Sequence, residues 1–161
     1  MSDATPTTRV TDQTFTLQQF PEKLAVVRLA PGAEIPQWAE SSSLFSITAT
    51  ATETSLVCAT RSVPTKTPSQ QPFTAFAVQG PLDFALTGVL CALLTPLAEA
   101  EIPVFTISTF DTDWILVPVG KATDAAEAWR AAGHAVAAAI PVIPEKKRKT
   151  ASKGPSKKPR S

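Results

Sequence analysis

The chain has 161 residues, of which 43% are hydrophobic and 18% charged, which suits one compact domain or two small units sharing a core. This composition excludes a disordered polyelectrolyte. The formal charge of +1 conceals an acidic body, because eight of the fifteen Lys and Arg lie in residues 145–161, and residues 1–144 are therefore a poor general binder of nucleic acid.

The first third of the chain predicts two strands and a short helix. Residues 1–12 are polar and are predicted to be disordered. Residues 14–20 (TFTLQQF) alternate as a strand does, and residues 23–29 (KLAVVRL) form the β-branched run typical of a strand covered on both faces. Pro31-Gly32 predicts a turn, and residues 34–41 (EIPQWAES) predict a turn or two of helix.

A hairpin and a linker follow. Residues 44–50 alternate between apolar and hydroxyl side chains, and residues 55–61 (SLVCATR) form a second strand that pairs with them antiparallel. Residues 64–72 are polar and rich in proline, and they predict the one internal linker.

The second half predicts a clearer set of elements. Residues 73–78 (FTAFAV) predict a strand, and leucines spaced by four, three and four predict a helix over residues 86–100, bent at Pro96. Residues 102–109 and 113–118 predict two strands joined by a tight link.

An alanine-rich helix and a last strand complete this order. The helix is predicted over residues 121–132, capped by Thr123 or Asp124 and ended by Gly133, and the strand over residues 135–140. Strand, helix, strand, strand, helix, strand is the ferredoxin-like order of an α+β domain.

The first half offers a decayed version of the same unit. The prediction is therefore a tandem α+β protein with a degenerate unit over residues 13–63, a full unit over 73–141 and a disordered basic tail over 142–161. Two antiparallel sheets that pack together would share one core.

Several features place the chain in the cytoplasm. No hydrophobic run follows Met1, so a signal peptide is not expected, and no apolar stretch approaches the roughly 20 residues of a membrane helix. Cys58 and Cys91 both lie in apolar runs. Two buried free thiols fit a reducing compartment, and a disulfide between them is the alternative.

The inventory for catalysis is thin. The chain has no Tyr, and its one histidine, His134, follows a predicted helix end, where histidines usually cap the helix or lie on the surface. No Cys or His spacing suits zinc, and no glycine-rich loop resembles a phosphate cradle. We therefore expect no enzyme, no metal and no cofactor.

The loop over residues 80–88 (GPLDFALTG) leads directly into the long predicted helix. A helix start has unpaired N–H groups and a partial positive charge, so it can hold a carboxylate. Thr87 and Gly88 would let a ligand approach the backbone. The alternative is a simple helix cap and hydrophobic staple formed around Asp83.

The turn over residues 108–113 (STFDTD) has two carboxylates and an aromatic ring. Asp111 and Asp113 are two residues apart at a strand end, so we expect them on the same side, where they favour a bound amine or guanidinium. Local hydrogen bonding within the turn is the alternative.

Three segments, residues 24–41, 78–100 and 102–118, resemble ACT-domain proteins related to the cytosolic arginine sensors, the CASTOR type. The stretches GPLDFALTG and STFDTDWILVP are the most specific part of this resemblance. It implies tandem ferredoxin-like units that bind an amino acid, without catalysis, and signal to a protein partner in amino-acid metabolism or nutrient sensing.

The resemblance also implies the ligand-binding residues. They are Leu86, Thr87 and Gly88 at the helix start, and Thr109, Phe110 and Asp113 at the turn. Asp111 is added to this predicted site from the carboxylate pattern of the turn. Arginine or lysine is the first expectation for the ligand. The chain has two units where the sensor has four, so a homodimer is expected to complete the site. Glu101 and Ala85 depart from the family pattern at the helix end and before the helix-start glycine.

Two rival functions remain open. One is a scaffolding protein that has the ACT fold and no ligand. The other is association with nucleic acid through the basic tail, where KKRK and KKPR between Lys146 and Arg160 also match a nuclear-import signal.

Overall fold

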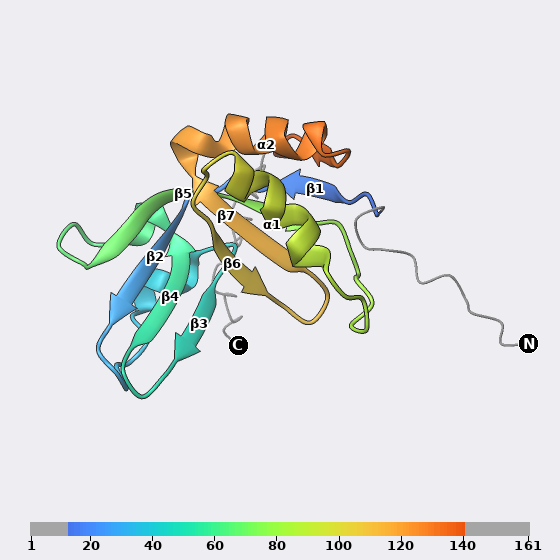
Figure 1. Ribbon diagram of the computed structural model, residues 1–161. Helices are drawn as coiled ribbons and strands as arrows, with labels where there is room; N and C mark the ends of the chain where they lie inside the picture. Colours follow the sequence, from blue (N-terminus) through green and yellow to red (C-terminus); the bar gives the residue numbers. More distant parts are fainter. Residues whose placement is uncertain (1–12, 141–161) are drawn as a thin grey trace, which may run out of the picture.

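A computed structural model describes residues 13–140, which form one twisted eight-stranded sheet with two α-helices on one face (Figure 1). The expected disordered residues 1–12 and the basic tail lie outside the described residues. The α+β class and the ferredoxin-like element order of the second half are confirmed. The strands expected in the first half are also present.

The first half contains short strands joined by 3-10 turns. Its Pro31-Gly32 turn is present, with Gly32 at a φ of 70°. The elements are β1 (Thr16–Gln19), β2 (Leu24–Leu29), η2 (Gln37–Ser41), β3 (Ser46–Ala49), β4 (Thr54–Ala59) and η3 (Thr60–Ser62).

The second half contains both α-helices. The elements are β5 (Ser69–Val78), α1 (Val89–Glu99), β6 (Phe105–Ser108), β7 (Asp113–Pro118), η4 (Val119–Lys121), α2 (Ala122–Ala131) and β8 (Ala135–Ala137).

The first unit is a ferredoxin-like sheet whose helices are reduced to single turns. Its strand order is β3-β4-β2-β5, all antiparallel, with η2 and η3 in the places of the two helices. Ala39, on η2, packs on Ala25, Val27, Leu56 and Cys58, so a small cluster replaces a helix-covered core.

The second unit shares its first strand with the first unit. The beginning of β5 pairs with β2, while residues 73–77 pair with β7, which pairs in turn with β6. β1 pairs antiparallel with the end of β5, and β8 pairs parallel with β1. β1 therefore lies between β5 and β8, so a strand from the start of the chain separates the first and last strands of the second unit.

The structure corrects the expectation of two packed sheets, because β5 joins both units into one sheet. β5 begins at Ser69, inside the segment predicted as a linker, and includes Pro72. The β2–β5 register shifts between Leu24 and Val26, opposite Pro72, and such an irregularity accommodates a residue without an N–H group. The proline signal therefore marked a bulge within a strand.

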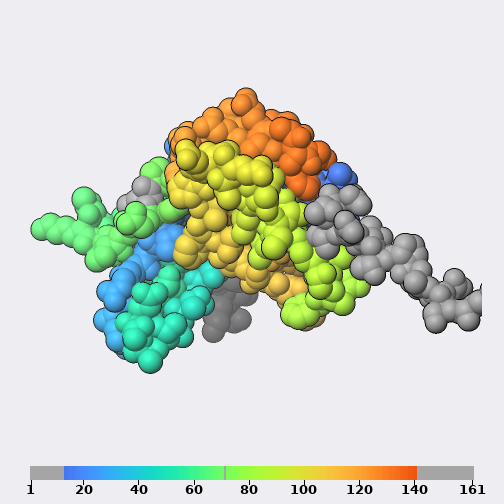
Figure 2. Space-filling model, viewed as in Figure 1, coloured from blue at the N-terminus to red at the C-terminus, as the bar shows by residue number. Residues whose placement is uncertain are grey.

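The main core lies between the sheet and the two helices. Val89, Leu93 and Leu97 form the buried face of α1, and they pack against the sheet together with Trp129 from α2. The Trp129 indole Nε1–H donates to the Leu93 carbonyl at 2.8 Å and ties the two helices together. Figure 2 shows α1 and α2 side by side over the second unit, with the first unit extending beyond them.

Several local expectations are wrong. α1 starts at Val89 and not at residue 86, and no side chain caps α2, whose N-cap is Lys121. Cys91 is exposed, whereas Cys58 is buried, and both thiols are free. His134 is buried and not a surface residue, because Gly133 at a φ of 92° turns the chain back under α2.

Candidate functional site

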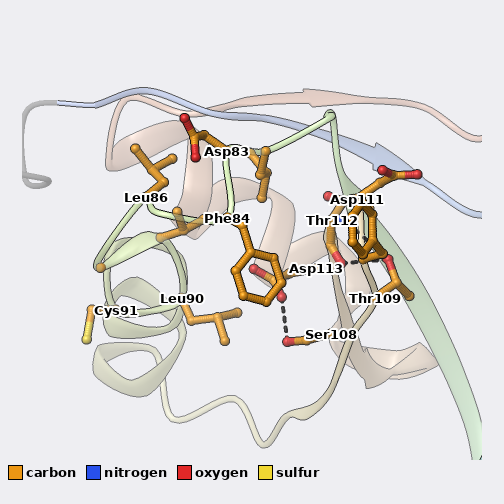
Figure 3. Close-up of a pocket in the computed structure, with 14 residues that line it drawn as sticks. Asp83, Phe84, Leu86, Leu90, Cys91, Ser108, Thr109, Asp111, Thr112 and Asp113 are labelled. Carbon is orange, nitrogen blue, oxygen red and sulfur yellow. Dashed lines mark hydrogen bonds between the residues drawn. The ribbon is translucent and has the colours of Figure 1, made fainter.

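A cavity of about 380 Å³ lies between the loop before α1 and the turn joining β6 to β7 (Figure 3). The structure brings six of the seven predicted ligand residues to this cavity, and Thr87 is not among those that line it. The six are Leu86, Gly88, Thr109, Phe110, Asp111 and Asp113. The volume lies within the usual range of small-molecule sites, about 300–1,000 Å³.

The loop before α1 leaves the start of the helix free of a side-chain cap. The Asp83 carboxylate accepts a hydrogen bond from the Ala85 N–H at 2.9 Å, and the Leu86 N–H donates to the Asp83 carbonyl at 2.9 Å. Asp83 therefore stabilises a local turn and does not cap the helix. Gly88, at a φ of 78°, is the N-cap, and no side chain bonds the first turn of α1. The unpaired N–H groups of this first turn lie at the end of the helix that borders the cavity. A helix N-terminus stabilises an anionic group there.

The opposite wall is a hydrogen-bonded turn that positions Asp113. The Ser108 hydroxyl donates to Asp113 Oδ1, so this carboxylate lies toward the cavity between Ser108 and Phe84 (Figure 3). The Thr109 N–H donates to the Thr112 carbonyl at 2.8 Å and closes the turn. Sequence reasoning gave no role to Ser108, although it lies within the predicted turn motif.

Asp111 and Asp113 do not point to the same side, which corrects the sequence-based expectation. The Asp111 carboxylate points outward, away from the Asp113 carboxylate (Figure 3). The alternation of side chains by two applies to extended strands, whereas Asp111 lies in the turn before β7 begins. One carboxylate therefore faces the cavity from this wall.

The two walls of the cavity are locked together near Gly80. The Leu82 N–H donates to the Asp111 carbonyl at 2.8 Å, and the Thr112 hydroxyl donates to the Val78 carbonyl. A Cβ added at Gly80 would lie 2.9 Å from the Asp111 carbonyl oxygen, closer than side chains tolerate. Only glycine fits this crossing, so the position of the turn relative to α1 depends on it.

Two exposed aromatic rings lie at the rim of the cavity. Phe84 and Phe110 are 86% and 85% exposed, and their ring centroids are 6.3 Å apart at an interplanar angle of 37°. Sequence reasoning identified Phe110 and missed Phe84 as a lining residue. Aromatic faces attract cations, and exposed apolar pairs often mark binding surfaces.

The charge of the cavity is negative. Its charged lining residues are Asp83, Asp111 and Asp113, and neither Lys nor Arg lines it. The lining also lacks His and Tyr, so its titratable groups are the three carboxylates and the Cys91 thiol. Its chemistry suits binding of a molecule with a cationic group. Within residues 13–140, no cluster of His, Cys, Asp and Glu is arranged to hold a metal ion.

A second hollow, on the first unit, contains an ion pair that sequence reasoning missed. Arg61 Nη2 lies 2.8 Å from Glu22 Oε1, and the Ser43 N–H donates to Glu22 Oε2 at 3.0 Å. Burial raises the pKa of Glu22, but the hydrogen bonds from Ser43 and the charge of Arg61 outweigh it and leave the pKa below its ordinary value. These contacts join the bend between β1 and β2, η3 and the segment before β3, which is a structural role.

Two family models match the chain. A model described as an ACT domain matches residues 69–130, and a model described as an N-terminal domain matches residues 22–66. No curated protein matches the chain. No helix within residues 13–140 is long and apolar enough to cross a membrane.

Several solved structures share the fold. The protein Atu0741 from Agobacterium tumefaciens is 30% identical, with a TM-score of 0.75, and the match covers 80% of this chain and 96% of that one. A protein of unknown function from Vibrio cholerae, VC0802, described as a possible transport protein, is 18% identical with a TM-score of 0.62, over 74% of this chain and 90% of that one.

The regulatory subunit of aspartate kinase from Thermus flavus is 10% identical with a TM-score of 0.51, over 75% of this chain and 97% of that one, and it supports the fold alone. These matches support an ACT domain and do not distinguish the arginine-sensing CASTOR type. The chain therefore belongs to the same protein family as Atu0741, and its second half is an ACT domain.

Proposed function

We propose that the chain is a non-enzymatic regulatory protein that binds an amino acid in the cavity between α1 and the β6–β7 turn. The observation that supports this most directly is the joint placement of an uncapped helix start, the Asp113 carboxylate and the Phe84–Phe110 pair around one cavity of an ACT domain. An amino acid has the complementary groups, since its carboxylate suits a helix start and a cationic side chain suits a carboxylate.

A basic amino acid, arginine or lysine, fits this arrangement best. In the proposed complex its main-chain carboxylate accepts hydrogen bonds from the first amides of α1 next to Gly88, and Thr109 bonds the main-chain amine. The side-chain cation pairs with Asp113, and the exposed rings of Phe84 and Phe110 cover its aliphatic stem. The absence of Lys and Arg from the cavity lining supports a cationic ligand.

The signal then passes to a second copy of the chain or to a protein partner in the cytoplasm, acting in amino-acid metabolism or nutrient sensing. The exposed Phe84–Phe110 pair supports such a contact, because a partner that covers it also closes the cavity over the ligand. The same pair is the observation that favours the rival function, a scaffold with no ligand.

A thermal-shift screen of the twenty amino acids separates the two functions. A ligand at about one hundred times its dissociation constant stabilises the fold by about 2.7 kcal/mol, which a melting curve detects readily. We expect arginine or lysine to raise the Tm of the full chain. If no amino acid raises it, the scaffold is the better function.

Two matched variants locate the ligand. Asp113→Asn removes the carboxylate that faces the cavity, and we expect it to abolish the response to basic amino acids. Asp111→Asn makes the same chemical change on the carboxylate that points outward, and we expect it to keep most of the response. Equal responses from both variants would place the ligand elsewhere.

A further inference from the structure

An apolar groove of about 270 Å³ lies on the face of the sheet opposite the two α-helices. Its lining includes Phe20, Pro21, Ala77, Trp114 and Ile140, and none of its described lining residues is charged. It shares no described lining residue with the cavity proposed above for the amino acid. Its volume is below the usual range of small-molecule sites, about 300–1,000 Å³. The groove therefore suits apolar side chains better than a metabolite.

The floor of the groove is one row of residues across three neighbouring strands. Gln18 on β1 pairs with Ala77 on β5, and Ala77 pairs with Trp114 on β7. Paired residues point to the same face of a sheet, so the small Ala77 side chain leaves a hollow between its two larger neighbours. The Phe20 ring meets the Trp114 ring edge-on at a centroid distance of 5.5 Å. This pair forms an aromatic wall beside the hollow.

The chain reaches this groove directly after its last strand. β8 pairs parallel with β1, with Ala137 opposite Gln18, so both strands end at the same side of the sheet. The Gln18 side-chain amide then donates to the Ala138 carbonyl. Two residues later, Ile140 lines the groove, although 69% of its surface is still exposed. The described part of the chain thus ends at the groove.

The sequence that follows Ile140 is complementary to the groove. It reads PVIP over residues 141–144, and charged residues begin at Glu145. A proline fixes its own φ and favours an extended residue before it, so Ile140 and Ile143 both favour polyproline-like backbone. Four such residues span about 12 Å, which exceeds the distance of about 10 Å across three neighbouring strands. Segments of the form Pro-x-x-Pro commonly bind aromatic-lined grooves.

We propose that residues 141–144 of the same chain bind in this groove and act as a strap over the helix-free face. A polyproline helix has three residues per turn, so Ile143 returns to the side of Ile140 and enters the groove, whereas Val142 points to solvent. The Ile143 side chain fills the hollow above Ala77. The strap covers the aromatic wall and starts the basic tail on the face opposite the helices.

A matched pair of variants in the full chain tests which side chain enters the groove. Ile143→Ser removes the aliphatic group from the hollow, and we expect it to lower the Tm by about 3–6 °C, as loss of a partly buried aliphatic side chain does in a chain of this size. Val142→Ser makes a similar change one residue earlier, on the solvent side, and should melt within about 1 °C of the parent. The melts contain no added amino acid, so their outcome is independent of the ligand site proposed above.

The tryptophan indole signals in an NMR spectrum give a second readout that does not depend on stability. The chain has three Trp, and Trp114→Phe identifies the signal of Trp114 by its loss. We expect Ile143→Ser to shift this signal and to leave the signal of Trp129, which is buried against the helices, in place. Val142→Ser should move neither signal.

Two other occupants are outcomes of the same test. If a second copy donated the strap, Ile143→Ser would shift the chain from dimer to monomer in analytical ultracentrifugation, whereas a strap from the same chain leaves the mass unchanged. If the groove were kept for the peptide of another protein, both serine variants would have the Tm and the Trp114 signal of the parent. Either result overturns the proposal, as does a Val142→Ser variant that loses as much stability as Ile143→Ser.

Discussion

Trp129 links α2 to α1, and its replacement by phenylalanine measures how much this link contributes to the free energy of unfolding. The side chain is fully buried, donates to the Leu93 carbonyl at 2.8 Å and meets the Phe76 ring edge-on at a centroid distance of 4.9 Å. Trp129→Phe keeps an aromatic ring but removes the N–H group and part of the buried volume. The lost hydrogen bond costs about 1 kcal/mol, and the cavity left behind costs about 1–2 kcal/mol more.

We therefore expect Trp129→Phe to lower the free energy of unfolding by about 2–3 kcal/mol, which lowers the Tm by about 5–10 °C for a chain of this size. Urea and thermal unfolding, followed by circular dichroism, measure both quantities. The matched control is Trp114→Phe, the same change at a partly buried residue that packs on Phe20 on the helix-free face. We expect it to cost less than about 1 kcal/mol. An equal or larger loss from the control would refute the role assigned to Trp129.

Three further predictions follow from single contacts. Gly80→Ala should lower the free energy of unfolding by about 1–3 kcal/mol, because the added Cβ forces the loop before α1 away from the β6–β7 turn. In the control Gly120→Ala the added Cβ meets nothing within 4 Å, so this variant should have the Tm of the parent. Glu22→Gln should cost about 1 kcal/mol at pH 7. Because folding lowers the pKa of Glu22, its stabilisation is fully present above the ordinary pKa of 4.5 and is lost as the pH falls through the lowered value. The difference between the two proteins in urea melts should therefore shrink steadily as the pH is lowered below 4.5. A difference that does not shrink at all as the pH falls would exclude the ionised carboxylate as its cause. A thiol reagent should modify the exposed Cys91 in the native protein and Cys58 only after unfolding. Burial, with a smaller effect of the Glu22 charge, raises the pKa of the Cys58 thiol and so disfavours its reactive thiolate. Reaction of both thiols in the native state would contradict this.

The sequence by itself determined most of the local structure. The apolar run at Leu24–Leu29 and the alternation before Ala49 are strand signals that depend on near neighbours, and the structure has β2 and β3 there. The two halves of the candidate site were also predictable. The loop before α1 and the β6–β7 turn are each short segments whose residue types, such as Gly88 and Asp113, indicate their chemistry without knowledge of the fold.

Long-range pairing was decided only by the tertiary structure. β1 lies between β5 and β8, and β5 belongs to both units. Which strands pair depends on which strand edges are free and which sheet faces must be buried, and no local sequence pattern specifies this. The same holds for single side chains. Cys91 lies in an apolar run that predicts burial, and His134 follows a helix end, where a surface position is expected. The packing of α1 and α2 leaves Cys91 exposed and His134 buried.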